Sequence, residues 1–370
     1  MKIIVDDKIP FLRGVLESCA EVVYLAGAKV TPEDTRNADA IITRTRTKCK
    51  EELLASSKVK FIATATIGFD HIDTGWCEAN DIKWTNAPGC NSSSVAQYIS
   101  SALLNLACEH KISLQGKTLG VVGVGNVGSK VAKVGEAFGM RVLLTDPPRA
   151  DKEGCEKFVN LEQIVAESDF ITMHVPLEKD GKYPTFHLGN GELFKSMKDS
   201  AFYINSSRGP ICDNAALKEA LKNNDIAGAI LDVWENEPDL DLKLLELVDF
   251  GTPHIAGYSY DGKANGTAMS VNALSEFFGL DFKDWYPSDV PVPKKTSMKI
   301  SSEGSFEEKM LVAVSLSYNI KDDSDRLRNS PATFEKQRGD YPLRREFPVF
   351  NVESTDAEVS KALIKLGFKH

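Results

Sequence analysis

Residues 120–128 read GVVGVGNVG, and this stretch decides the fold. It ends a short apolar run, opens a helical pattern, and places Gly123, Gly125 and Gly128 in the spacing G-x-G-x-x-G. In a strand-to-helix turn the first glycine permits the tight turn and the second leaves room for a pyrophosphate. The third glycine lets the helix pack close to the strand. The motif alone is common, but its flanks here predict a dinucleotide-binding unit.

The residues after this turn favour NAD as the dinucleotide. The phosphates would meet the positive helix N-terminus at Asn126 and Val127. The next strand, RVLLTD, ends in Asp146, eighteen residues past Gly128. A carboxylate there accepts both ribose hydroxyls and repels a 2′-phosphate, so NAD is favoured over NADP. Arg149 is the one nearby residue that would suit NADP.

Short apolar strands alternate with helical stretches on both sides of the turn, which predicts parallel, doubly wound sheets. The later strands read DFITMHV, AFYINSS, GAILDVW and DFGTPH, and the earlier ones KIIVDD, AEVVYL, DAIITR and VKFIATA. We therefore expect an α/β protein with two Rossmann-like domains and a small α+β C-terminal module. The expected division is residues 1–95 with 258–285 for substrate, 96–257 for NAD, and 286–370 for dimerisation.

The C-terminal residues differ in pattern from the rest of the chain. A proline-rich linker, YPSDVPVPKK, leads to one amphipathic helix, SFEEKMLVAVSLSYNI, then a polar loop and a terminal strand-helix pair. A module this small has little core of its own. We expect it to pack against something large, most simply a second copy of the chain.

Composition excludes several function classes. The net charge of −9 argues against nucleic acid held by a general basic field. No apolar run approaches a membrane span, and the first residues carry no signal-peptide core. The seven cysteines are scattered without a C-x-x-C pair, which favours reduced thiols in a cytoplasm over a disulfide framework or a metal site.

Three residues follow predicted strands of one sheet: Arg208, Glu237 and His254. Ligands bind outside the carboxyl ends of such strands, so the three side chains are expected to converge. Imidazole suits the role of base for a hydroxyl proton, and a carboxylate beside it favours its protonated form. A guanidinium grips a carboxylate with its planar fork. The set predicts oxidation of an alcohol that stands next to a carboxylate, with NAD as acceptor.

The motifs GVGNVG, HVPL, INSSRGP, LDVWENEP and TPHIAGYS resemble the D-2-hydroxy acid dehydrogenases. In that family the Arg, Glu and His of these motifs are catalytic, which implies the same roles for Arg208, Glu237 and His254. TATIGFDHID, APGCNSSSVAQY and LRNSPATFEKQRGDYPLRREF narrow the resemblance to a branch that acts on a phosphorylated four-carbon 2-hydroxy acid. It covers the chain from residue 1 to the last helix and implies a homodimer joined partly through the C-terminal module.

The same resemblance implies individual contacts. The implied substrate contacts are Thr45, Thr66 and Tyr258. The implied cofactor contacts are Asn126, Val127, Asp146, Val175, Ser206, Ser207, Arg208, Asp232 and Gly257.

A phosphorylated substrate needs its own cations. In TRTRTK, Arg44, Arg46 and Lys48 follow a strand and would share a face if the chain stays extended. Arg344 and Arg345 form the second candidate cluster. A solvated basic strip remains an equal alternative for both clusters.

Two other functions stay open at this point. One is a dehydrogenase of another 2-hydroxy acid, such as glycerate or 3-phosphoglycerate. The other is a non-catalytic, NAD-sensing regulator with the same fold, although binding alone does not need a proton carrier.

Overall fold

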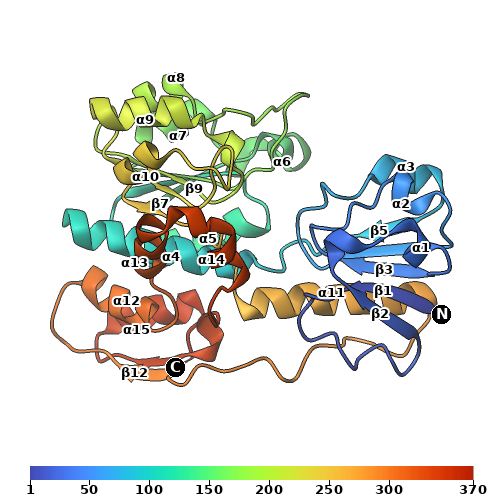
Figure 1. Ribbon diagram of the computed structural model, residues 1–370. Coiled ribbons are helices and arrows are strands. Elements are labelled where there is room, and N and C mark those ends of the chain that lie inside the picture. The colour runs from blue at the N-terminus through green and yellow to red at the C-terminus, as the bar shows by residue number, and fades with distance from the viewer. Residues whose placement is uncertain (370) are drawn as a thin grey trace. The chain divides into compact units, whose positions relative to one another are not determined.

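The computed structural model describes residues 1–369 and divides the chain into two compact units (Figure 1). Unit 1 comprises Met1–Asn91 and Ser259–Pro291, and unit 2 comprises Ser92–Tyr258 and Val292–His370. Each unit is built around its own parallel sheet.

Unit 1 holds a five-stranded sheet in the order β2-β1-β3-β4-β5, with every neighbouring pair parallel. Helix α11 packs Val271 and Leu274 against Ile3, Val5 and Phe61 on one face of this sheet. The four predicted strands are present, and β5 is an additional one. The elements are β1 Lys2–Asp6, β2 Glu21–Leu25, α1 Pro32–Thr35, β3 Ala40–Thr43, α2 Glu51–Leu54, β4 Phe61–Thr64, α3 Thr74–Ala79, β5 Lys83–Thr85 and α11 Tyr260–Phe278.

Unit 2 contains a six-stranded parallel sheet in the order β11-β10-β9-β8-β6-β7, the doubly wound arrangement that the sequence predicts. The sequence offers Asp213 or Asn214 as the N-cap of α9, and the structure has Asp213, which accepts from the backbone N–H groups of Ala215 and Ala216. The elements are α4 Ser92–His110, β6 Thr118–Val122, α5 Asn126–Ala137, β7 Arg141–Thr145, α6 Pro147–Glu153, α7 Leu161–Glu167, β8 Phe170–Met173, α8 Gly191–Ser196, β9 Phe202–Asn205, α9 Asn214–Asn223, β10 Gly228–Leu231, α10 Leu242–Leu247 and β11 Phe250–Gly251.

The C-terminal residues of unit 2 contain more helix than predicted. The expected polar loop after residue 320 forms two helices, α13 and α14, and the amphipathic helix ends at Ser315. The prediction of a loop failed because the sequence of α13 is mostly polar. The apolar side chains that α13 buries are Ile320 and Leu327, about two helical turns apart, and this spacing is too sparse to stand out as a helical pattern. The elements are β12 Ser297–Lys299, α12 Phe306–Ser315, α13 Ile320–Asn329, α14 Phe334–Gly339, β13 Asn351–Glu353 and α15 Ala357–Leu366.

The C-terminal segment packs on the nucleotide-binding part of its own chain. Helix α4 contacts α12 and α13, and α5 contacts α15 (Figure 1). Helix α13 also contacts strand β11 of the sheet, where the Gly251 N–H donates to the Ser324 hydroxyl (3.2 Å). Met310, Val314 and Leu363 join the same buried core as Leu103 and Leu119. The sequence predicts that this small segment packs against something large. Within residues 1–369, it packs on helices α4 and α5 of its own chain. A separate dimerisation domain at 286–370 stays a prediction.

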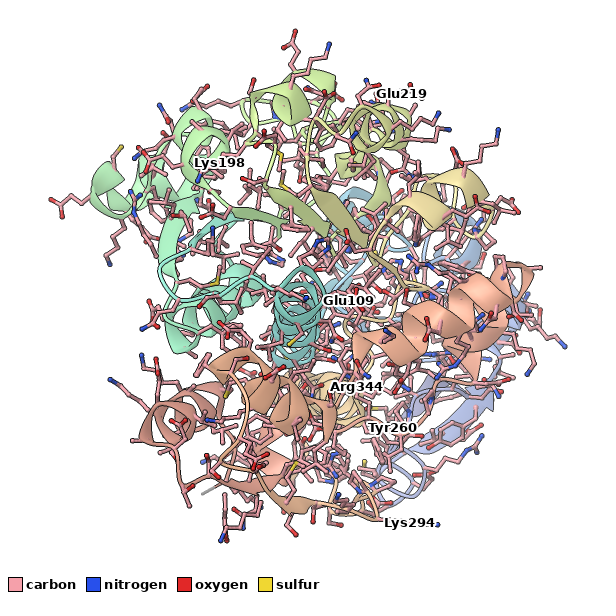
Figure 2. The ribbon with its side chains drawn as sticks, turned by 90° about the vertical axis from the view of Figure 1, so that its left-hand side faces the viewer. Glu109, Lys198, Glu219, Tyr260, Lys294 and Arg344 are labelled. Atoms are coloured by element: carbon pink, nitrogen blue, oxygen red, sulfur yellow. The ribbon has the colours of Figure 1, made fainter. Side chains whose placement is uncertain are left out.

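Arg344 fixes this packing rather than facing a ligand. It is 3 % exposed and is labelled in Figure 2. Its guanidinium donates to Gln97 Oε1 (2.7 Å), to the Ser94 carbonyl (2.6 Å) and to the Ile255 carbonyl (3.3 Å). It also lies 3.7 Å from the centre of the Tyr318 ring. Its donors are occupied inside the protein, so Arg344 is a poor candidate for the phosphate.

Two further features of residues 1–369 concern membrane-spanning helices and disulfide bonds. Among residues 1–369, no helix combines the length and the apolar character that crossing a membrane requires. All seven cysteines lie within these residues and are free.

Candidate active site

The glycine-rich turn joins β6 to α5 with the geometry that its three glycines predict. Gly123 has φ +86°, and a Cβ atom there would lie 2.6 Å from the His174 carbonyl oxygen. A Cβ on Gly128 would lie 1.9 Å from the Gly123 carbonyl oxygen, so the helix can approach the turn only without a side chain. A Cβ on Gly125 would meet nothing within 4 Å. The space beside Gly125 is therefore open for a ligand.

Asp146 stands at the end of β7, where a ribose would be bound. One of its carboxylate oxygens accepts from the Val124 N–H (2.8 Å) and the other from the Arg149 N–H (3.1 Å). Each oxygen keeps a lone pair for a hydroxyl donor. The Arg149 guanidinium pairs with Glu153 (2.7 Å) and donates to the Val124 carbonyl. Because this arginine is engaged within the protein, the site fits NAD better than NADP.

Polar groups after β9 also fit a dinucleotide. The Ser206 hydroxyl is buried and has no hydrogen-bond partner among residues 1–369. A buried hydroxyl needs an acceptor or donor, and a bound cofactor would supply one. Ser207 instead donates from its N–H (3.1 Å) and its hydroxyl (2.8 Å) to Asn205 Oδ1. Val175 packs beside Gly123, as a wall of the same turn.

The residues Arg208, Glu237 and His254 follow three strands that are neighbours in the sheet, β9, β10 and β11. The strands end at the same level, since Leu231 pairs with both Asn205 and Gly251. Beyond the strands, the Asp232 N–H donates to the Asn205 carbonyl (3.0 Å) and the His254 N–H to the Asp232 carbonyl (2.7 Å). These hydrogen bonds bring together the backbone that follows the three strands, and convergence of all three side chains stays a prediction.

Arg208 is held by the backbone and by Asn205. The Asn205 amide donates to the Arg208 carbonyl (3.0 Å), and the guanidinium donates to the Ser207 carbonyl (2.8 Å). A Cβ on Gly209 would lie 2.0 Å from the Trp234 carbonyl oxygen, so this loop lies flat against the loop after β10. Within residues 1–369 no carboxylate pairs with Arg208. Its charge is available to an anionic ligand.

Glu237 and His254 form the central pair of the site. Glu237 Oε1 lies 2.5 Å from His254 Nδ1. Burial by itself would raise the pKa of the Glu237 carboxyl, but the hydrogen bond and charge of His254, the Trp234 N–H and the charge of Arg338 together lower it. An ionised carboxylate only accepts hydrogen bonds, so Nδ1 must be the donor. Nε2 of the neutral ring is then the nitrogen that can accept a proton.

Asp232 positions His254, a role that the sequence did not reveal. It is 1 % exposed, and its carboxylate accepts from the Thr252 hydroxyl (2.6 Å), the Ile255 N–H (2.8 Å) and the Ala256 N–H (2.9 Å). Burial raises its pKa, although the charge of His254 and these hydrogen bonds offset part of that effect. His254 has φ +56°, a left-handed conformation that costs free energy in a residue with a side chain. The bonds to Asp232 hold it there. A cofactor contact at Asp232 stays a prediction.

Tyr258 and Arg345 connect the site to the C-terminal segment. The Tyr258 N–H donates to the Ile255 carbonyl (2.8 Å), and its ring meets that of Tyr341 edge-on at 5.8 Å. Gly257 lies in the same turn. The Arg345 carbonyl accepts from the Gln97 amide (2.9 Å). Substrate contacts at Tyr258 and Arg345 stay predictions.

The remaining predicted residues belong to unit 1. Thr66 Oγ1 lies 2.8 Å from Thr64 Oγ1, and Arg44 Nη2 lies 3.4 Å from Asp6 Oδ1. The buried Arg44 Nε has no hydrogen-bond partner in the described part of the chain. The chain bends at residues 45–47, so the extended alternation expected for Arg44, Arg46 and Lys48 ends with β3. Thr45 and Arg46 are exposed.

Lys263 is a cation near Arg44 that sequence reasoning missed. It lies on α11, and burial first and then the charge of Arg44 lower its pKa. Arg44 and Lys263 are more than two hundred positions apart in the sequence, so no local pattern could have paired them.

Comparisons with known proteins show the family to which the chain belongs. Residues 100–256 match the family model "D-isomer specific 2-hydroxyacid dehydrogenase, NAD binding domain", and residues 290–367 match a domain of unknown function. An erythronate-4-phosphate dehydrogenase from Bacteroides fragilis is 51 % identical over 96 % of this chain and 100 % of its own length. The chain belongs to the erythronate-4-phosphate dehydrogenase family. A member from Porphyromonas gingivalis is 40 % identical over 100 % of both chains.

A solved structure supports the same assignment. D-lactate dehydrogenase from Aquifex aeolicus, complexed with NAD and lactic acid, has a TM-score of 0.60 and 30 % identity, and covers 75 % of this chain and 96 % of its own. The predicted family, Rossmann-like fold, oxidoreductase class and NAD cofactor are therefore confirmed.

Substitution by alanine should have different effects at Gly125 and Gly128, the second and third glycines of the turn. Gly125→Ala should leave thermal stability unchanged but weaken NAD binding by about tenfold or more, because the methyl group occupies the ligand's space. Gly128→Ala should also lower stability by about 1–3 kcal/mol, because the methyl group meets the Gly123 carbonyl. Calorimetric NAD titration and thermal unfolding separate the two effects. Equal unfolding temperatures for both variants would contradict the packing role of Gly128.

The Glu237–His254 pair should make stability depend on acid pH. The folded-state pKa of Glu237 lies below its usual value of 4.5, so its contribution is present above that pH and is lost as the pH falls through the folded pKa. Glu237→Gln should therefore flatten the loss of unfolding free energy between about pH 6 and about pH 3. Urea unfolding at several pH values measures this slope. Parallel slopes for both proteins would rule out the pair as a source of stability.

Proposed function

We propose that this chain oxidises 4-phospho-D-erythronate at C2 to 2-oxo-3-hydroxy-4-phosphobutanoate with NAD, a step in pyridoxal 5′-phosphate biosynthesis. The observation that carries the proposal is the Glu237–His254 pair at the ends of neighbouring strands, beside the Arg208 loop. The identity to erythronate-4-phosphate dehydrogenases over nearly the whole chain supports the substrate.

His254 is the proposed base. Its Nδ1–H donates to the ionised Glu237 carboxylate, which leaves Nε2 to accept the proton of the substrate's C2 hydroxyl. The imidazolium that forms is stabilised by the same carboxylate. The N–H groups of Ile255 and Ala256 donate to Asp232 and hold the backbone next to His254 in place, which keeps the imidazole beside Glu237.

Arg208 is the proposed clamp for the substrate carboxylate. Its planar fork suits a bidentate contact, and its charge stabilises the oxygen on which negative charge develops. When bound, NAD accepts the hydride from C2. The glycine turn, Asp146 and the buried Ser206 hydroxyl would hold the cofactor.

The two alternatives are less well supported. A regulator that only senses NAD does not need a histidine that a carboxylate orients, as Glu237 orients His254. Nor does it need an arginine such as Arg208, which pairs with no carboxylate among residues 1–369. A dehydrogenase of glycerate or 3-phosphoglycerate would use the same three residues, but the alignments to the relatives named above cover 96 % and 100 % of this chain and so extend into the C-terminal segment.

His254→Asn should lower kcat with 4-phosphoerythronate by about 100- to 10,000-fold, because it removes the proton acceptor. NAD affinity should persist, since His254 is not part of the glycine turn. The assay is NADH absorbance, with NAD binding measured by calorimetry. His187→Asn is the matched control, because His187 also pairs with a carboxylate, Glu235, at 2.7 Å in the same unit. A His254→Asn enzyme that keeps its rate would overturn the mechanism.

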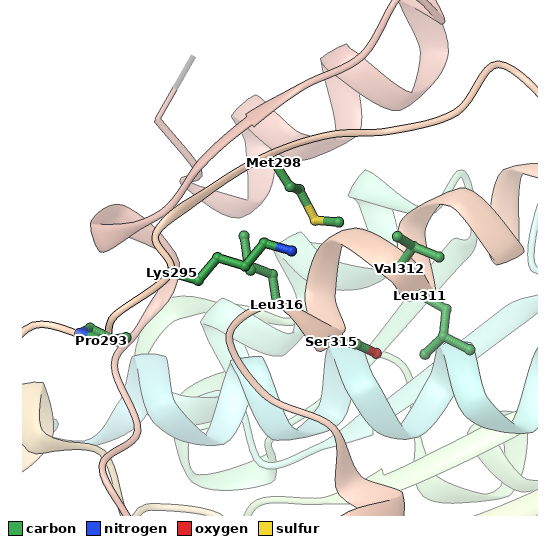
Figure 3. Close-up of a pocket in the computed structure, with 7 residues that line it drawn as sticks. All are labelled: Pro293, Lys295, Met298, Leu311, Val312, Ser315 and Leu316. Atoms are coloured by element: carbon green, nitrogen blue, oxygen red, sulfur yellow. The ribbon is translucent and has the colours of Figure 1, made fainter.

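We also propose that the enzyme is a cytoplasmic homodimer joined through its C-terminal segment. Figure 3 shows an apolar depression on this segment, lined by Met298, Leu311 and Leu316 together with Val312, which is 48 % exposed. Exposed apolar surface of this kind is typical of an interface. Seven free cysteines fit a reducing compartment.

Val312→Glu should shift the dimer toward monomer, because it places a charge in the apolar depression. Light scattering after gel filtration measures the mass. Leu242→Glu, at an exposed leucine of α10, is the control and should stay dimeric. An unchanged mass for Val312→Glu would exclude this face from the interface.

A further inference from the structure

Arg338 brings the charge of the C-terminal segment close to the catalytic residues of the same unit. It lies on α14, and its guanidinium carbon is 5.7 Å from the centre of the Tyr258 ring. Tyr258 follows His254 by four positions and also contacts Tyr341, just beyond α14. The segment 334–341 therefore packs against Tyr258, at the end of the loop that carries His254.

The charge of Arg338 acts on the catalytic pair itself. It is one of the causes that lower the pKa of the Glu237 carboxyl. The charges that lower the pKa of the Glu237 carboxyl are those of His254, its hydrogen-bonded partner, and of Arg338 on α14. An arginine supplied by the C-terminal segment lies within electrostatic reach of the proposed reaction centre.

The hydrogen-bonding capacity of Arg338 is only partly used. Its side chain is 23 % exposed, Nη1 donates to Glu335 Oε1 (3.1 Å), and the guanidinium also hydrogen-bonds with the Tyr258 side chain. Its Nε is buried and, among the residues that the structure describes, has no hydrogen-bond partner. A guanidinium has five N–H donors in a rigid fork, and leaving a buried donor unpaired costs free energy. An anion with several oxygens would satisfy it.

We propose that Arg338 binds the phosphate group of the substrate. This inference rests on the proposed function, because it assigns a residue to the second anionic group of 4-phosphoerythronate. The D-lactate dehydrogenase that was solved with lactic acid aligns with 75 % of this chain, and its substrate has one anionic group. The C-terminal segment supplies a cation beside the catalytic pair, and a phosphorylated substrate has a second anion to match it.

The test compares substrates with and without the phosphate. Arg338→Met should lower kcat/KM for 4-phosphoerythronate by about 10- to 100-fold, the range expected for losing charge-assisted hydrogen bonds. For erythronate, which lacks the phosphate, the change should stay within about threefold. Lys336→Met is the matched control, because Lys336 is an exposed residue of the same helix that pairs with Asp340. This control should leave both substrates unaffected.

A binding measurement keeps the inference separate from the proposed activity. Glycerol 3-phosphate, a phosphate monoester without a 2-hydroxy acid, is titrated into the NAD-loaded protein, and Arg338→Met should weaken its binding by at least tenfold. If the wild type fails to oxidise 4-phosphoerythronate but this difference remains, the proposed function is wrong and the phosphate site stands. Arg338→Lys, which keeps the charge, replaces the Met variant if thermal unfolding shows that the latter does not fold.

One result would overturn the inference. If Arg338→Met lowers kcat/KM equally for erythronate and 4-phosphoerythronate, shifts the pH profile of both, and leaves glycerol 3-phosphate binding unchanged, Arg338 acts only through Glu237.

Discussion

The buried carboxylate of Asp232 ties the end of β10 to the loop that follows β11. It accepts from the Thr252 hydroxyl and from two successive backbone N–H groups, while its own backbone links Asn205 to His254. Hydrogen bonds to a buried charge contribute about 1.5–3 kcal/mol each. This free energy offsets the positive φ of His254 and fixes the imidazole where Glu237 can reach it. Without Asp232 the sheet would still form, but the proposed base would lose its orientation.

Close backbone approaches are the second constraint on the site. Gly128 allows α5 to lie on the turn after β6, and Gly209 allows the Arg208 loop to lie on the loop after β10. In both places a single methyl group would overlap a carbonyl oxygen. The dinucleotide turn and the proposed substrate clamp thus depend on the same simple condition, which is the absence of a side chain.

The C-terminal segment is part of the core of unit 2 and not an appendage. Arg344 donates to α4 and to the Ile255 carbonyl, which is adjacent to His254. Arg338 lies beside Tyr258 and influences Glu237. The segment therefore acts in two ways near His254. Arg344 holds the backbone beside His254 in place, and Arg338, in our proposal, binds the substrate phosphate.

The sequence by itself determined the features that depend on neighbouring residues. The glycine spacing, the strand-helix alternation, the cap at Asp213 and the positions of Arg208, Glu237 and His254 after strands can all be predicted, because each follows from local pattern and from the rule that parallel strands end at one edge. Only the tertiary structure decided the roles of Asp232, Arg338 and Arg344 and the helical state of α13. Arg344 meets Ser94 across 250 positions of the chain. Whether such an arginine is buried or faces a ligand depends on which distant groups surround it, and no local pattern encodes that.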